Sequence, residues 1–242
     1  MPIKIRKVTK NMATFGSILL WVVYPYLMLG SFFIGTIWRM RRSGTVTAKS
    51  SEFLEKKRLI WGSILFHVGL LGVFGGHFIG IFIPESWTSA LGISEHFYHV
   101  YMAMAMGGVF GAMFVVGALV LVYRRFTTPK VFVTSSLSDT VVIVALTITI
   151  ILGMLSSFVS GPMHPDFNYR ESISVWARGL FILQPKWQLM AGVPLMYKIH
   201  IICGFAMFGF FPYTRLVHAL YVPIQYLGRR YVVYRRYKKE GE

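Results

Sequence analysis

The sequence predicts an all-α integral membrane protein with five transmembrane helices. Of the 242 residues, 55% are hydrophobic and only 14% are charged, and the apolar residues gather in five long runs. A typical soluble domain has about 25% charged residues, and about 20 apolar residues of helix cross the roughly 30 Å of a bilayer core. The composition therefore excludes an ordinary soluble protein, and the 16% aromatic content excludes a disordered one.

The positions of the charges define the expected spans. Four runs contain no Asp, Glu, Lys or Arg: about residues 15–38, 59–83, 100–123 and 140–160. The fifth, about 195–222, contains Lys198, Pro212 and Arg215 and is the weakest by composition. Because proline has no N–H to donate, we expect Pro212 to kink this helix. The chain then forms one membrane domain, 1–242, with a polar tail at 223–242.

The stretch between the fourth and fifth spans is too polar to cross a membrane. We expect residues 173–190 to lie along the membrane surface, with Trp176 and Trp187 at headgroup depth. This segment therefore adds no sixth span.

The basic residues predict the orientation. The chain has 25 Lys and Arg; with five spans, 17 of them fall on the face that holds residues 39–58 and the C-terminus, and 8 on the other. Cytoplasmic loops carry the excess of positive charge, so we expect a multi-pass protein of the cell membrane with its N-terminus outside and its C-terminal tail in the cytoplasm. This basic face either only sets orientation and binds anionic lipid or also docks a cytoplasmic partner.

Four of the seven histidines lie in two of the expected spans: His67 and His77 in the second, His200 and His218 in the fifth. A single histidine in a membrane helix is more often a packing residue. Four of them with almost no intramembrane carboxylate partners indicate a metal, because neutral imidazole can ligate iron without placing a bare charge in lipid. The single cysteine, Cys203, excludes an internal disulfide and a cysteine-based cluster, and the absence of a Cys-x-x-Cys-His motif excludes a covalently attached haem.

The topology pairs these histidines. The second and fifth spans run antiparallel, so His77 and His200 share the outer half of the membrane, while His67 and His218 share the inner half. We therefore expect two bis-histidine haems stacked across the bilayer. Glycines crowd the second and third spans and leave room either for a porphyrin or for close helix packing; they are Gly69, Gly72, Gly75, Gly76, Gly80, Gly107, Gly108 and Gly111.

Three stretches carry a resemblance to a known family: FHVGLLGVFGGHFIG (66–80), YKIHIICGFAMFGFFPYTRLVHALYVPIQYLGRRY (197–231) and TAKSSEFLEKKR (47–58). They combine His-x9-His on one span with His-x17-His and a following V-P-x-x-Y-L. In these features the chain resembles, over about residues 16–236, the gamma subunit of membrane-bound respiratory nitrate reductase in its Gram-positive form, a dihaem cytochrome b.

The resemblance implies the same ligand pairs, His77 with His200 for the outer haem b and His67 with His218 for the inner one. It implies quinol oxidation beside the outer haem, with menaquinol favoured by the Gram-positive form. It also implies two cytoplasmic partners, an iron–sulfur beta subunit and a molybdenum-containing alpha subunit that reduces nitrate. The basic N-terminal extension, residues 1–15, departs from the family pattern and receives no role.

Quinol oxidation needs a hydrogen-bond acceptor near the outer haem. Two loop histidines, His96 and His99, precede the third span, and alignment backward from Gly107 and Gly108 places His99 where the family has a basic quinol-binding residue. Imidazole can accept a proton near neutral pH, and Gly76 leaves room beside His77. The alternative is that His99 is an ordinary exposed loop residue.

Two other functions are consistent with parts of the pattern. The cytochrome b of a heterodisulfide-reductase-like complex would use the same haems with a different soluble partner. A proton or metal transporter could use the same histidines, although the five spans show no inverted repeat of the kind common in secondary transporters.

Overall fold

The structure, a computed structural model, describes residues 14–42 and 55–220. In these residues it is helical and contains no strand. Five helical segments are long and apolar enough to cross a membrane, which confirms the number of spans that the sequence predicts over this part of the chain. They are Thr14–Arg41, Lys57–Phe82, Glu95–Thr127, Leu137–Met163 and Leu195–Tyr213.

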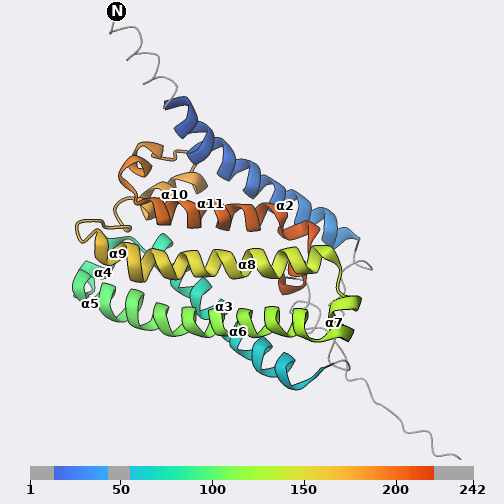
Figure 1. Ribbon diagram of the computed structural model, residues 1–242. Coiled ribbons are helices and arrows are strands. Elements are labelled where there is room, and N and C mark those ends of the chain that lie inside the picture. Colours follow the sequence, from blue (N-terminus) through green and yellow to red (C-terminus); the bar gives the residue numbers. More distant parts are fainter. Residues whose placement is uncertain (1–13, 43–54, 221–242) are drawn as a thin grey trace, which may run out of the picture.

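The long helices lie side by side with the order α2, α11, α8, α6 and α3 (Figure 1). Their bounds are α2 Tyr24–Arg41, α3 Lys57–Phe82, α6 Gly107–Thr127, α8 Leu137–Leu155 and α11 Leu195–Phe210. Short helices mark the two ends of the bundle: α4 (Glu85–Ala90), α5 (Glu95–Phe97) and α9 (Gly161–Met163) at one, here named the α4 end, and α7 (Pro129–Thr134) at the other, the α7 end.

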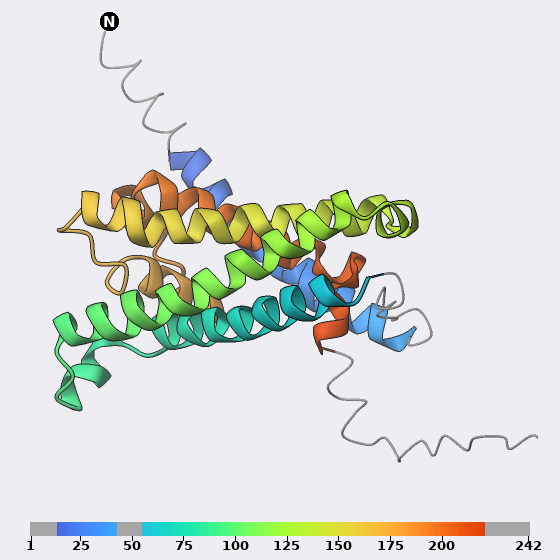
Figure 2. The same cartoon turned by 60° about the horizontal axis from the view of Figure 1, so that its bottom comes forward.

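Glycines let α3 and α6 pack backbone to backbone (Figure 2). A Cβ at Gly69 would lie 2.4 Å from the backbone nitrogen of Phe114, and one at Gly117 would lie 2.3 Å from that of Phe66. Gly72 likewise faces the ring of Phe110. Close helix packing thus explains these glycines, and clearance for a porphyrin does not. Only where a Cβ would meet nothing within 4 Å, as at Gly75 and Gly76, does the second span offer open space.

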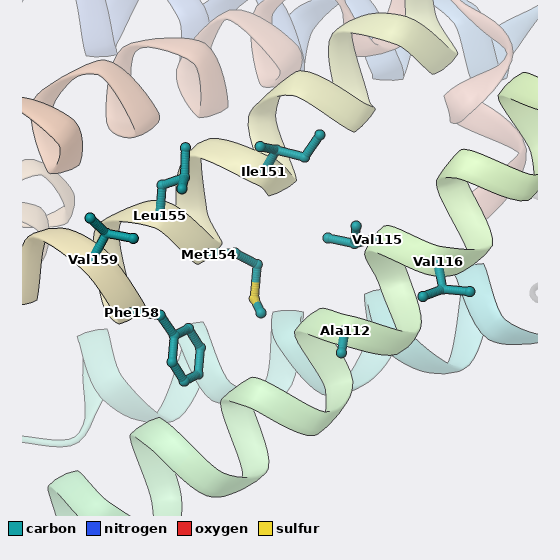
Figure 3. Close-up of a pocket in the computed structure, with 8 residues that line it drawn as sticks. All are labelled: Ala112, Val115, Val116, Ile151, Met154, Leu155, Phe158 and Val159. Atoms are coloured by element: carbon teal, nitrogen blue, oxygen red, sulfur yellow. The ribbon is translucent and has the colours of Figure 1, made fainter.

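The third span packs on the fourth through side chains that fill the space over its glycines. A Cβ at Gly108 would lie 2.8 Å from the ring of Phe158, and one at Gly111 would lie 2.3 Å from the sulfur of Met154. Beside these contacts α6 and α8 border a groove of about 350 Å³ lined by eight apolar side chains, among them Ala112 and Val115 (Figure 3). No histidine lines the groove, so it is separate from the predicted metal ligands.

Pro212 ends α11 and does not merely kink it, which corrects the prediction of one helix to residue 222. The helix stops at Phe210, a single turn follows over Phe211–Tyr213, and Thr214 is extended with φ −116° and ψ 178°. The Ser31 hydroxyl of α2 donates to the Gly209 carbonyl at 2.8 Å and so satisfies one acceptor at this helix end. His218 therefore lies on a separate short segment after the break.

The segment between the fourth and fifth spans folds into the protein. Its helix α10 (Ile173–Phe181) packs on α3, and Trp176 is only 1% exposed. The indole N–H of Trp176 donates to the Trp21 carbonyl at 2.8 Å, and the two rings meet edge to face at 5.8 Å. Trp176 therefore packs in the core of the protein and does not face lipid headgroups, while the depth of Trp176 and Trp187 along the membrane normal stays a prediction.

Ion pairs tie the helices together at the α7 end. Arg124, 4% exposed, donates through Nε to the Glu55 carboxylate at 2.7 Å, and Arg215 pairs with Asp139 at 2.9 Å.

Several features of the sequence lie outside the described residues, in 1–13, 43–54 and 221–242. They are the basic N-terminus, most of the TAKSSEFLEKKR stretch (47–58), the V-P-x-x-Y-L motif and the C-terminal tail.

Candidate metal centre

Two histidines face each other toward the α4 end. His77 lies five residues before the end of α3, and His200 lies in the second turn of α11. Their ring centroids are 6.0 Å apart, with 40° between the ring planes. The Nδ1 atom of His77 lies 2.8 Å from the Val73 carbonyl oxygen, and that of His200 lies 2.9 Å from the Thr149 carbonyl oxygen of α8.

The other two histidines form a second pair toward the α7 end. The ring centroids of His67 and His218 are 6.5 Å apart, with 70° between the planes. The Nδ1 atom of His67 lies 2.7 Å from the Ser63 carbonyl oxygen, and that of His218 contacts the Arg215 carbonyl oxygen. The structure thus brings together the same two pairs that the topology predicts, although His218 arrives there on a separate segment and not on the helix that carries His200.

The hydrogen bonds fix the tautomer of all four rings. A carbonyl oxygen can only accept, so each Nδ1 must carry the proton and donate it. The Nε2 atom then keeps its lone pair, which is the form of imidazole that binds a metal. No hydrogen bond joins any of the four Nε2 atoms to another residue that the structure describes.

The spacing of the pairs fits a metal between them. Two imidazoles that ligate one ion from opposite sides, with metal–nitrogen bonds of about 2.0 Å, have ring centroids about 6 Å apart. Across the described residues, no group of three or more His, Cys, Asp or Glu could hold a metal ion. Each pair therefore suits a metal whose other ligands come from a macrocycle, as in a bis-histidine haem.

Helix α8 supplies two contacts to His200 that the sequence did not reveal. Thr149 accepts the Nδ1 proton through its backbone carbonyl, and Gly153, one turn later, lies against the ring. A Cβ at Gly153 would come within 2.8 Å of the His200 Cε1 atom. A glycine in the middle of an apolar span was the only sequence signal for this contact, and many other glycines share it.

The predicted quinol residues do not form a closed site in the structure. His99 is exposed in the first turns of the third span, and no hydrogen bond or ion pair joins its side chain to a residue within the described ranges. Gly76, beside His77, has open space where a Cβ would lie. The structure thus leaves open space at Gly76, next to the outer pair, and the residues that it describes form no closed quinol site with His99.

Comparison with known proteins decides the family. A family model described as nitrate reductase gamma subunit matches residues 17–237. The chain belongs to the nitrate reductase gamma subunit family. It is 42% identical over 219 residues to the nitrate reductase gamma chain of Bacillus subtilis, covering 90% of this chain and 97% of that one. The match confirms the resemblance seen in the sequence.

Further gamma-family relatives agree. The respiratory nitrate reductase 2 gamma chain of Escherichia coli is 32% identical over 219 residues, covering 88% of this chain and 94% of that one. The nitrate reductase-like protein NarX of Mycobacterium tuberculosis is 42% identical over 220 residues, 90% of this chain. The chain spans only about a third of the length of that Mycobacterium protein, of which the match covers 33%. As a gamma subunit, the chain is one component of a membrane-bound oxidoreductase complex.

Proposed function

We propose that this gamma subunit oxidises quinol, with menaquinol favoured, at the outer face of the cell membrane and passes the electrons inward through two b haems. His77 and His200 would hold the outer haem and His67 and His218 the inner one. The observation that carries the proposal is the geometry of the two pairs: facing rings about 6 Å apart, each with Nδ1 bound to a backbone carbonyl.

Bound haem iron supplies reversible one-electron transfer between its ferric and ferrous states. The chain holds each imidazole in one tautomer and one orientation, so the Nε2 lone pairs keep their position in both states. Because the pairs lie toward opposite ends of the bundle, electrons would cross the membrane within this one chain. Moving one charge across stores about 2.3 kcal/mol per 100 mV.

The electron acceptor would dock at the α7 end. The arginines of that end, together with the excess of positive charge in the loops and tail of the same face, favour a cytoplasmic location. The partners would be the iron–sulfur beta subunit and, beyond it, the molybdenum-containing alpha subunit that reduces nitrate. Family membership favours these partners over a heterodisulfide-reductase-like complex and over a transporter.

The quinol would bind at the α4 end, between the outer pair and the lipid. His99 would accept a hydroxyl proton and release it outside, and the open space at Gly76 would admit the quinol ring next to His77. This part of the proposal requires His99, now exposed, to reach the bound quinol.

Counting haems in variants tests the ligand pairs. The purified complex should show two b haems by pyridine haemochrome analysis, and His200→Ala should remove the outer haem while the inner one stays. His67→Ala should remove the inner haem while the outer one stays. His164→Ala is a matched control, because His164 also places Nδ1 against a backbone carbonyl, at 2.8 Å from Ser160, yet faces no histidine ring among the described residues. Two haems in the His200 variant, or a colourless wild-type protein, would refute the assignment.

A further inference from the structure

Side chains from one distant segment hold the end of α3. The Ser174 hydroxyl donates to the Gly80 carbonyl at 2.9 Å, and Arg178 donates to the Ile81 carbonyl at 2.6 Å. Arg170 adds a longer contact to the Ile83 carbonyl at 3.4 Å. The last carbonyls of a helix have no partner within the helix, so this segment, which starts almost 90 residues later, completes the final turn of α3.

The Arg178 bond acts next to a proposed haem ligand. In α3 the N–H of Ile81 donates to the carbonyl of His77, four residues earlier. The Ile81 residue that Arg178 holds is therefore hydrogen-bonded to the backbone of His77. If the last turn frayed, the His77 ring would lose its fixed height and direction relative to His200.

Arg170 and Arg178 differ in how their charges are balanced. Arg170 is 3% exposed, forms an ion pair with Glu95, and stacks at 4.0 Å on the ring of Tyr98. Arg178 is half-buried, and none of the carboxylates that the structure describes pairs with it. Burial and the neighbouring Arg170 charge lower the pKa of Arg178, but a guanidinium stays protonated at physiological pH. An unneutralised positive charge thus sits on the carbonyl of Ile81, the residue one turn after His77 in α3.

We propose that Arg178 is a positioning residue for the outer haem ligand His77 and that its charge raises the reduction potential of that haem above the value it would otherwise have. The inference rests on the proposed function. A positive charge held in a medium of low dielectric favours the ferrous state, which carries one positive charge fewer. A higher potential at the outer haem makes it a better acceptor for electrons from quinol.

Redox titration of the membrane-bound complex, following the reduced alpha bands of the two haems, tests the proposal. Arg178→Gln should lower the potential of the outer haem and shift its low-spin ferric electron paramagnetic resonance signal, with both properties of the inner haem unchanged. Arg178→Lys keeps the charge and should restore most of the potential. Lys186→Gln is the matched control, because it removes one positive charge from an exposed side chain of the same connection and should shift neither haem.

Each outcome of the Arg178→Gln titration either supports or overturns the proposal. Loss of the outer haem alone from Arg178→Gln would also support a positioning role, since the inner haem would report that the chain had folded. An unchanged potential and signal in a variant with two haems would overturn the proposal, as would equal loss of both haems, which indicates a general role in folding. The wild-type titration distinguishes a failure of the Arg178 proposal from a failure of the proposed function, because the proposed function requires two haems in the wild-type protein.

Discussion

Gly153 lies directly against the ring of His200. A Cβ built on this glycine would stand 2.8 Å from Cε1 of the imidazole, closer than real Cβ contacts come, and 3.2 Å from Nδ1, which is also tight. The same stretch of α8 accepts the His200 Nδ1 proton at Thr149. One face of α8 therefore sets both where the His200 ring lies and which of its nitrogens carries the proton.

This contact predicts a specific defect. Gly153→Ala should displace the His200 ring from the position that faces His77 and reduce the occupancy of the outer haem to less than half, while the inner haem stays. Pyridine haemochrome analysis and redox titration measure both. Gly30→Ala is the control, since it is also a glycine inside a spanning helix but has nothing within 4 Å of the added Cβ. Full haem content in the Gly153 variant would show that α8 moves aside easily.

The ion pair between Glu55 and Arg124 predicts a pH dependence of stability. The backbone N–H of Arg58, followed by the side chain of Arg124, lowers the pKa of the Glu55 carboxyl. Stabilisation by this group is therefore present above its unfolded pKa of about 4.3 and is lost as the pH falls through the lower folded value.

The corresponding experiment compares melting temperatures in detergent as the pH is lowered. Glu55→Gln should melt a few degrees below the wild type at pH 7, and the difference should shrink as the pH falls through the lowered pKa of Glu55, because the wild-type carboxyl then becomes protonated as well. Glu171→Gln is a control at an exposed glutamate with no hydrogen bond to the described part of the chain. A difference in melting temperature that does not narrow as the pH is lowered would point to packing and not to the charge.

The sequence predicted the spans and histidine pairs because both depend on features that are local or periodic. Charge-free runs give the helices, and antiparallel crossing brings His77 near His200 whatever the details of packing. The prediction for the end of α11 was wrong because a proline may bend or stop a helix. Here Thr214 adopts an extended backbone after Pro212, which depends on tertiary contacts such as that from Ser31 to Gly209.

The contacts that position the site were harder to predict. Gly153 touches His200 across 47 residues of sequence, and Arg178 caps Ile81 across almost 100. Neither residue belongs to a motif. A glycine in an apolar span does not distinguish Gly153 from positions such as Gly69, which lies in the contact of α3 with α6. The burial of Trp176 was hard to predict for a related reason, since an indole suits an interface and a core equally well.

The C-terminal tail should bind the iron–sulfur subunit. Residues 222–236 contain Arg229, Arg230, Arg235 and Arg236 and follow closely after His218, where electrons would leave the chain. Truncation after Tyr226 should release the soluble subunits into the cytosolic fraction while the truncated chain keeps both haems. Immunoblots of membrane and cytosolic fractions measure this. Retention of the soluble subunits at wild-type levels would leave the tail as a lipid-binding segment.

The last prediction concerns the quinol site. His99 is accessible at the start of the third span, toward the same α4 end of the bundle as the open space at Gly76. If its imidazole accepts the quinol proton, His99→Ala should lower quinol-dependent haem reduction by about 10²- to 10⁴-fold, the range typical of a lost general base. Both haems should remain, and so should activity with an artificial donor to the soluble subunits. His96→Ala, three residues earlier and also exposed, is the matched control and should oxidise quinol normally. Unchanged quinol kinetics in the His99 variant would place the proton acceptor elsewhere and leave His99 as an ordinary surface residue.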